Sequence, residues 1–212
     1  MDNGFYPRWL EWAQRLQAIA QTGLYYNPPE FDRQRYEMIQ TIAAEIMAAG
    51  GANFEAVLAA LSVQTGHATP KVDVRGVVFQ EDRILLVQER LDENRWTLPG
   101  GWADIGESAA ESVVREIAEE TGYRTRAVKL LAVYDRNKHA HPPYLFHAYK
   151  LFFQCELVDD QRYPDPNNVE TGEVGWFRAD ALPELSTSRV TAAQIMRFFV
   201  HRENPALPTD FD

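Results

Sequence analysis

The first part of the chain carries apolar residues at helical spacing. This pattern predicts an amphipathic helix that Gly23 ends, and Asn27-Pro28-Pro29 then breaks the chain. The stripe of this helix consists of Trp9, Trp12, Leu16 and Ile19. We expect it to pack on a core.

Two further helices follow in the same segment. Asp32 is positioned to cap the second helix, which Gly50-Gly51 closes, and Asn53 is positioned to cap a third helix through Leu61. The second helix has a stripe formed by Tyr36, Ile39, Ala43, Ile46 and Met47. We therefore expect a small helical domain over residues 1–66.

Beyond a linker at residues 65–70, the apolar period changes from helical to two. Residues 72–78 alternate as a strand, Glu81-Asp82 predicts a hairpin turn, and residues 84–87 continue the hairpin. Further strands are predicted over residues 127–134, 144–157 and 174–177, and Ser186 or Thr187 is positioned to cap a last helix through Phe199. This order predicts an α+β fold with a mixed sheet between helices, in a second domain over residues 67–212.

Residues 98–123 combine a glycine pair with a helix that has two distinct faces. Ala110, Val113, Val114 and Ile117 form an apolar stripe, and the acidic face lies roughly 115° away from it. The helix can therefore lie on a sheet while its acids face sideways into a cleft.

The acidic face concentrates Glu116, Glu119 and Glu120 within five positions of the last helical turn. An i,i+4 pair of like charges destabilises a helix, and the negative end of the macrodipole disfavours acids there. A divalent cation bound to the carboxylates would remove both penalties. The pattern therefore predicts a metal site.

Composition narrows the function. The net charge of −10 over 212 residues disfavours DNA or broad nucleic-acid binding. The single cysteine, Cys155, excludes an intrachain disulfide and fits a reducing, cytoplasmic environment. No apolar run is long enough to span a bilayer, so we expect no membrane partner.

With its spacing written out, the central stretch resembles the Nudix box at every defined position: Gly101-x5-Glu107-x7-Arg115-Glu116-Ile117-x-Glu119-Glu120-x-Gly122-Tyr123. The resemblance implies an α/β/α sandwich and a pyrophosphohydrolase. Mg²⁺ or Mn²⁺ would neutralise the pyrophosphate and activate water.

The resemblance also implies roles for individual residues. We expect Glu116, Glu119 and Glu120 to hold the metal, joined by the backbone carbonyl of Gly100. Arg115 and Glu107, with Gly101 beside them, would support the site by orienting the carboxylates.

The general base is open between the box and a later loop. Some Nudix enzymes use a loop glutamate, and Glu170 and Glu173 precede the strand at residues 174–177. We favour Glu170, which lies six residues before Trp176, as some relatives place their loop glutamate.

Three other residues are weaker candidates for contacts to the substrate. Arg75 could reach a phosphate, although a cross-strand ion pair explains it equally well. Lys138 and His141 could contact phosphate or the linked group from a polar loop. A zinc site at His139, His141 and His147 is disfavoured, because no pair has compelling ligand spacing.

The helical leader and several segments outside the box resemble one Nudix subgroup. Its members hydrolyse nucleoside diphosphates linked to a group X, including nucleotide sugars, and CDP-choline and ADP-ribose pyrophosphatases belong to it. The alternatives are a hydrolase of RNA ends or oxidised nucleoside triphosphates, and a non-catalytic ligand sensor. The large apolar residues of the leader, together with the resemblance, predict a homodimer.

Overall fold

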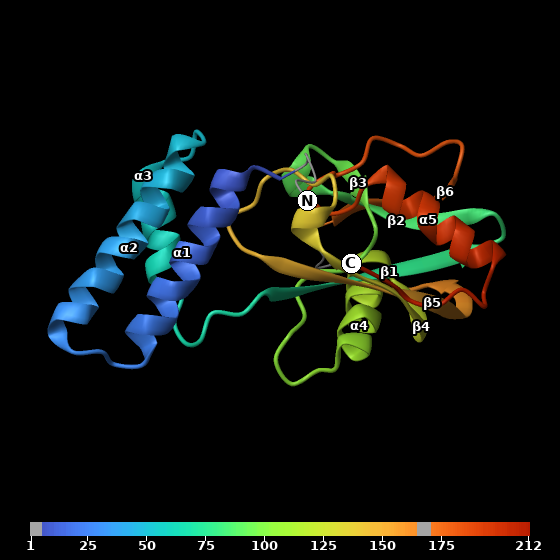
Figure 1. Cartoon of the computed structure of the whole chain (residues 1–212). Coiled ribbons are helices and arrows are strands. Elements are labelled where there is room, and N and C mark those ends of the chain that lie inside the picture. Colours follow the sequence, from blue (N-terminus) through green and yellow to red (C-terminus); the bar gives the residue numbers. More distant parts are fainter. Residues whose placement is uncertain (1–5, 165–170) are drawn as a thin grey trace. The chain divides into compact units, whose positions relative to one another are not determined.

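The computed structural model describes residues 6–164 and 171–212, which divide into two compact units (Figure 1). We call them the helical unit, which comprises Met1–Lys71 and Pro142–His147, and the sheet unit, which comprises Val72–His141 and Ala148–Asp212. The boundary expected between residues 66 and 67 stays a prediction.

The helical unit contains α1 (Arg8–Tyr25), α2 (Glu30–Ala49) and α3 (Phe54–Ser62). Asn53 caps α3 as expected, because its side chain accepts a hydrogen bond from the Ala56 N–H. A small core joins the three helices through Leu10, Ala13, Ala44, Met47, Val57 and Leu61.

Two details of these helices differ from expectation. Gly23 lies inside α1, where a Cβ would come within 2.4 Å of the Tyr36 ring, so this glycine permits close packing rather than ending the helix. Asp32 does not cap α2; Pro29 holds that position, and Asp32 pairs with Arg35 within the first turns.

The predicted stripe of α1 is only partly buried. Trp12 is 50% exposed and Ile19 is 54% exposed, whereas Ala13 and Ala20 are fully buried. The helices approach each other through the small alanines, which leaves larger apolar side chains on the outer face.

The segment Pro142–His147 belongs to the helical unit although it lies far along the sequence. Leu145 and Phe146 pack against the helical core, and the Gln14 side-chain amide donates to the carbonyls of Tyr144 and Leu145. The strand predicted to begin at residue 144 therefore begins later, at Ala148.

The sheet unit contains seven strands among the described residues, in the order β3-β2-β1-β5-β4-β7, with β6 also paired to β2. Strand β2 pairs antiparallel with β1, β3 and β6, β4 pairs antiparallel with β5, and β4 and β7 pair in parallel. The bounds are β1 (Lys71–Gln80), β2 (Arg83–Glu89), β3 (Arg95–Thr97), β4 (Tyr123–Asp135), β5 (Ala148–Arg162), β6 (Thr171–Arg178) and β7 (Asp210–Phe211), with short 3₁₀ turns η1 (Arg90–Asp92) and η2 (Arg136–Lys138).

The strands bury apolar residues on both faces of the sheet, beneath α4 (Ala109–Thr121) and α5 (Ala192–Glu203). Val74 and Val78 of β1 share a core with Ile117 of α4, while Val77 shares a core with Phe198 of α5. Since neighbouring side chains in a strand point to opposite faces, the two helices cover opposite faces (Figure 1). The predicted α+β sandwich with a mixed sheet and a preceding helical domain is confirmed.

The last helix begins later than expected. Thr191, rather than Ser186 or Thr187, caps α5 and forms a capping box with Gln194. Ser186 instead donates a hydrogen bond of 2.6 Å to Asp92. In the described part of the chain, no helix is long and apolar enough to cross a membrane.

Candidate active site

Helix α4 is fixed firmly at both ends. Ser108 and Glu111 form a capping box at its start, and Gly122 ends it in the left-handed conformation. Val113 and Ile117 are fully buried against the sheet. The glutamates of the last turns therefore extend from a rigid support.

The glycine pair lies beside this helix because residues 99–103 run along β1. Val74 N–H donates to the Gly101 carbonyl and Gly76 N–H donates to the Pro99 carbonyl, at 2.8 Å each. Between them, Gly100 turns its N–H to Glu120 Oε2 at 2.7 Å. Gly100 has φ +134°, and a Cβ there would lie 2.1 Å from the Val74 carbonyl, so only glycine fits.

The Arg115 guanidinium forms hydrogen bonds to four surrounding carboxylates. Its Nε lies 3.0 Å from Glu107, and one terminal nitrogen lies 2.9 Å from both Glu116 and Glu119. The other terminal nitrogen binds Asp104 at 3.0 Å. Burial alone would lower the pKa of Arg115, but these acids outweigh it and raise the pKa, so Arg115 stays charged.

Glu116 and Glu120 are the acids most affected by burial. Burial raises the pKa of both, to about 8 for Glu120, while the positive charge of Arg75 works in the opposite direction. A Cβ on Gly101 would lie 3.1 Å from Glu116 Oε2, so both acids border the glycine pair. Desolvated carboxylates beside a glycine turn fit a hard divalent cation, which would supply the missing positive charge.

The carboxylates do not yet converge around one point. Within residues 6–164 and 171–212, no group of three or more His, Cys, Asp or Glu side chains is arranged so that it could hold a metal ion. Glu116 and Glu119 turn instead to Arg115, and Glu120 turns to Gly100. Each of Glu116 and Glu119 accepts from Arg115 through one carboxylate oxygen, so the other oxygen could turn toward a metal while the bond to Arg115 is kept.

Arg75 lies in β1 with its side chain buried. Its Nε donates to Asp73 at 2.8 Å, and a terminal nitrogen donates to the Leu98 carbonyl at 3.2 Å. The ion pair is thus within one strand, not across strands. Lys150 of β5 also donates to Asp73. Sequence analysis missed Asp73 and Lys150, because β1 shows an ordinary alternation in which Asp73 and Arg75 look like solvent-facing residues.

The two loop candidates for substrate contact differ in exposure. Lys138, at the end of η2, is exposed. His141 is only 3% exposed; its Nδ1 lies 2.7 Å from the Thr187 carbonyl and its Nε2 lies 3.2 Å from the Gln194 amide. A contact between His141 and substrate would require it to lose one of these bonds.

Of the two loop acids, Glu170 lies outside the described residues. The next residue, Thr171, donates its hydroxyl to the Glu120 carbonyl at 3.1 Å. Glu173 is exposed on β6, and its N–H donates to Gln88 at 3.2 Å.

Glu89 is a further acid near the box that sequence analysis did not single out. It ends β2, pairs in register with Thr171, and its negative charge helps raise the pKa of Glu120. Arg189 holds it at 2.9 Å. Its place at the end of an apolar strand was the signal in the sequence.

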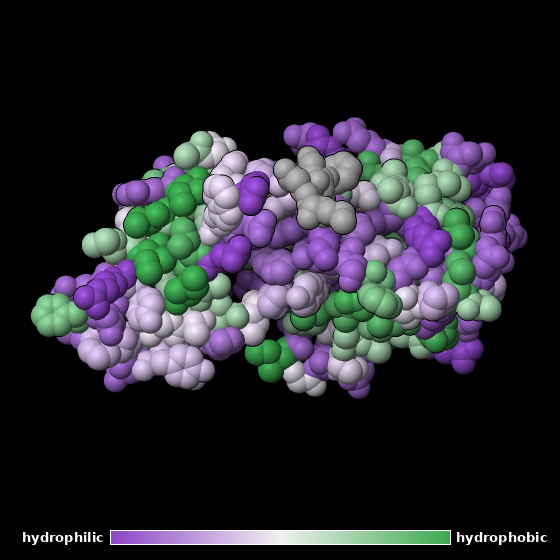
Figure 2. Space-filling model, in the orientation of Figure 1, coloured by the Kyte–Doolittle hydropathy of each residue, from purple (hydrophilic) through white to green (hydrophobic). Residues whose placement is uncertain are grey.

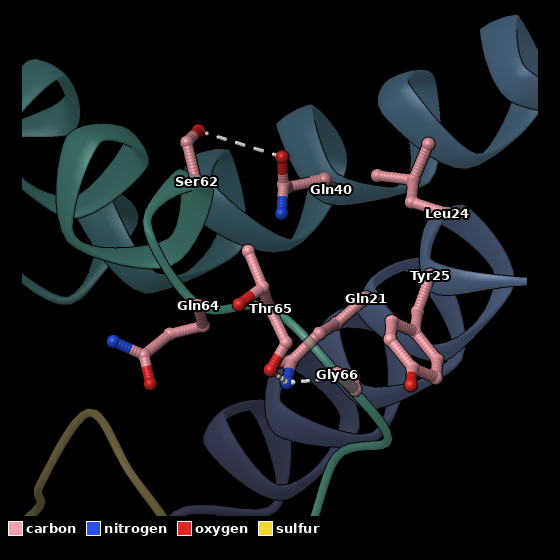
Figure 3. Close-up of a pocket in the computed structure, with 8 residues that line it drawn as sticks. All are labelled: Gln21, Leu24, Tyr25, Gln40, Ser62, Gln64, Thr65 and Gly66. Atoms are coloured by element: carbon pink, nitrogen blue, oxygen red, sulfur yellow. Dashed lines mark hydrogen bonds between the residues drawn. The ribbon is translucent and has the colours of Figure 1, made fainter. Parts of the chain in front are cut away.

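A hollow of about 200 Å³ in the helical unit is another place where a ligand could bind (Figure 3). It is lined by side-chain amides, hydroxyls and Tyr25. Gln21 donates to the Thr65 and Gly66 carbonyls, and Ser62 donates to Gln40. The lining contains no carboxylate, histidine, lysine or arginine, so the hollow has no side chain suited to bind a metal or to act as a general base in hydrolysis.

Comparison with known families decides the identity of the sheet unit. Residues 69–199 match the NUDIX domain model. The chain belongs to the Nudix hydrolase family. Residues 7–61 of this Nudix hydrolase match a second model, described as a UDP-X-like, N-terminal oligomerisation domain. The resemblance in the box and the helical leader is therefore confirmed.

Three relatives of the Nudix hydrolase cover between two thirds and nearly all of its length. It is 45% identical over 206 residues to "Putative ADP-ribose pyrophosphatase YjhB" of Bacillus subtilis (strain 168). The aligned region covers 97% of each chain. A crystal structure of a UDP-X diphosphatase has TM-score 0.62 at 32% identity, covering 96% of this chain and 98% of that one. An ADP-ribose pyrophosphatase from Streptococcus suis 89-1591 has TM-score 0.60 at 38% identity, covering 68% of this chain and all of that one.

The helical unit of this hydrolase leaves a large apolar surface uncovered (Figure 2). The exposed large residues there are Trp12, Ile19, Tyr25, Tyr26, Phe31, Met38, Ile42 and Val63. Contiguous exposed apolar surface is typical of a protein interface. This agrees with the oligomerisation domain that the region matches.

Proposed function

We propose that this Nudix hydrolase cleaves the pyrophosphate bond of a nucleoside diphosphate linked to X, using Mg²⁺ or Mn²⁺. The products would be a nucleoside monophosphate and a phosphorylated X. The observation that carries the proposal is the placement of two desolvated glutamates, Glu116 and Glu120, against the Gly100-Gly101 turn.

Glu116, Glu119 and Glu120 would hold the metal, together with the carbonyl of Gly100. The ion would neutralise phosphate charge and make bound water a better nucleophile. Arg115 and Glu107 orient these carboxylates through the bonds already described. Arg75 would meet a phosphate oxygen, since it carries a positive charge beside Glu116 and Glu120.

Glu170 is our choice for the base that takes the proton of the attacking water. Thr171, the first described residue after it, donates to the Glu120 carbonyl, so β6 begins beside the box helix. Glu173, on β6, is the second choice. Lys138 and His141 are retained as candidates for contacts to phosphate or to X.

ADP-ribose is the first substrate to test, because a relative that matches 97% of the chain carries that name. A UDP-linked compound is the second, from the related UDP-X diphosphatase structure and the description of the leader. CDP-choline remains a third candidate. RNA ends and oxidised nucleoside triphosphates are the alternative substrates.

A substrate panel tests the proposal directly. Purified protein is incubated with ADP-ribose, a UDP-sugar, CDP-choline, an oxidised triphosphate and a capped RNA, each with Mg²⁺ or Mn²⁺ and with excess chelator. Mass spectrometry of the products should show a nucleoside monophosphate and phosphorylated X. Hydrolysis of only the triphosphate or the RNA would contradict the substrate class, and full activity in chelator would contradict the metal.

We also propose that the enzyme is a homodimer assembled through the helical unit, in the cytoplasm. The exposed apolar face of α1, which carries Trp12 and Ile19, supports this assembly. Light scattering at micromolar concentration should give twice the chain mass of 24.2 kDa. A monomeric mass would exclude the dimer.

A further inference from the structure

Lys150 is a buried lysine that the proposed chemistry does not use. It lies on β5, beside β1 in the sheet, and is only 1% exposed. Its Nζ donates to Oδ2 of Asp73. A buried ion pair is expensive to desolvate and often no more stable than packed apolar residues, so its presence suggests a purpose besides stability.

Asp73 joins Lys150 to Arg75. Its Oδ2 accepts from Lys150, and its Oδ1 accepts from Arg75 Nε at 2.8 Å. Asp73 is 6% exposed and Arg75 is 7% exposed. Burial raises the pKa of Asp73, but the two cations outweigh it and hold the pKa below its usual range. Burial lowers the pKa of Lys150 to about 8, while the charge of Asp73 works in the opposite direction. The three groups form a hydrogen-bonded chain across two neighbouring strands.

The far end of this chain is the candidate active site. Arg75 donates to the carbonyl of Leu98 at 3.2 Å, two residues before Gly100. A Cβ on Gly100 would lie 2.9 Å from the Arg75 Cα, so the two backbones are in close contact. Gly100 in turn donates to Glu120. Arg75 is therefore held at the turn that borders the box glutamates.

The division of the Asp73 oxygens explains what Lys150 contributes. A guanidinium beside a carboxylate favours a two-pronged arrangement in which it binds both oxygens. Here Lys150 donates to Oδ2, and its positive charge disfavours a guanidinium nitrogen at the same oxygen. Arg75 therefore has one bond to Oδ1 and keeps a terminal nitrogen on the Leu98 carbonyl. Without Lys150, Arg75 could rotate onto both oxygens of Asp73 and away from the turn.

We propose that Lys150 is a positioning residue for the hydrolysis, which holds Arg75 at the glycine turn by occupying one oxygen of Asp73. The proposal rests on the proposed function, in which Arg75 meets a phosphate oxygen of the substrate. Lys150 itself touches neither substrate nor metal. Its effect on catalysis passes entirely through Arg75.

A double-mutant cycle tests this chain of contacts. The variants are Lys150→Met, Arg75→Gln and their combination, measured for KM and kcat with the best substrate of the panel. Lys150→Met should raise KM about tenfold, with a smaller change in kcat, as for lost binding of the phosphate. In the Arg75→Gln background, the same change should have little further effect, because coupled residues are not additive.

A graded substitution and a matched control separate positioning from stability. Lys150→Gln can still donate to Asp73, so its KM should be lower than that of Lys150→Met. If the methionine variant does not fold, Lys150→Gln replaces it in the double-mutant cycle. Arg197→Met removes a different ion pair of the sheet unit, with Asp210. It should lower the melting temperature and leave KM unchanged.

The outcomes are distinct. An equal fold-change of KM in both backgrounds, or a lower melting temperature with unchanged KM, overturns the positioning role. A wild-type enzyme that hydrolyses no diphosphate-linked substrate in the panel overturns the proposed function instead. The positioning role in that hydrolysis then falls with it.

Discussion

Helices α1 and α4 are both amphipathic, but the apolar spacing in the sequence locates the buried face of only one. In α4, Ile117 is fully buried as its stripe predicts. In α1, the predicted residues Trp12 and Ile19 are half exposed, while Ala13 and Ala20 are fully buried.

The difference shows that an apolar stripe can face either the core of its own unit or a partner surface. Helix α4 has a sheet to cover, so its large apolar residues are buried within the same unit. Helix α1 packs on its neighbours through alanines, and its bulkier residues remain for another surface. Exposed tryptophan and isoleucine on one helical face are unfavourable in water, which argues for a partner on that face. A mismatch between apolar spacing and burial can thus indicate an interface.

The largest effect should come from the acidic face of α4. Glu116→Gln and Glu120→Gln should each lower turnover by roughly two or more orders of magnitude, because they remove charge needed to hold the metal. The same substitution on α1, Glu11→Gln, provides the control at an exposed position. Steady-state kinetics with Mg²⁺, checked by circular dichroism, measures the contrast. Wild-type turnover in both α4 variants would refute the metal assignment.

The next effect concerns the base. Glu170→Gln should lower kcat by about 10²-fold, in the range for general-base catalysis, with little change in metal affinity. Glu173→Gln, near the start of β6, is the matched variant. If Glu173→Gln has the large effect and Glu170→Gln is neutral, the assignment is exchanged. If both are neutral, the base lies in the box.

The exposed face of α1 should control assembly. Trp12→Asp combined with Ile19→Asp should weaken the dimer at least about tenfold, because a charge replaces buried apolar contacts. Ile105→Asp is the control, since Ile105 is exposed on the sheet unit. Analytical ultracentrifugation over a concentration series measures the change. A dimer of unchanged affinity would show that this face is not the interface.

The comparison also explains which parts were predictable. The box helix, its glycine cap and the glutamate cluster follow from short-range spacing, so the sequence was sufficient for them. The buried ions were not predictable, because Asp73 and Lys150 lie 77 positions apart and meet only when β1 and β5 become neighbours. The place of residues 142–147 in the helical unit likewise depends on tertiary packing, by Leu145 and Phe146.

His141 should make stability depend on pH. Burial and nearby cations lower its pKa to about 3, whereas an unfolded histidine titrates near pH 6.5. Between these values the unfolded chain binds more protons, so the free energy of unfolding falls as pH falls, by up to about 1.4 kcal/mol per pH unit. His141→Gln should reduce this slope, and the exposed His67→Gln should not. Urea unfolding at several pH values decides it; an unchanged slope contradicts a buried neutral His141.

The last prediction compares the stability effects of replacing Gly23, within α1, and Gly122, which ends α4. Gly23→Ala in α1 places a methyl 2.4 Å from the Tyr36 ring, and such overpacking should cost about 1–3 kcal/mol despite the higher helix propensity of alanine.

Gly122→Ala at the end of α4 is strained for another reason. Its φ is +77°, and the new Cβ would lie 2.8 Å from backbone atoms of residues 163 and 164. Trimming Tyr36 to leucine should therefore restore stability to Gly23→Ala, because the obstacle there is a side chain. No side-chain change should rescue Gly122→Ala, because the obstacle there is backbone.

Thermal unfolding of the single and double variants measures the loss of stability and its rescue. Failure of the Tyr36→Leu rescue would show that Gly23 is required for its backbone conformation and not for packing.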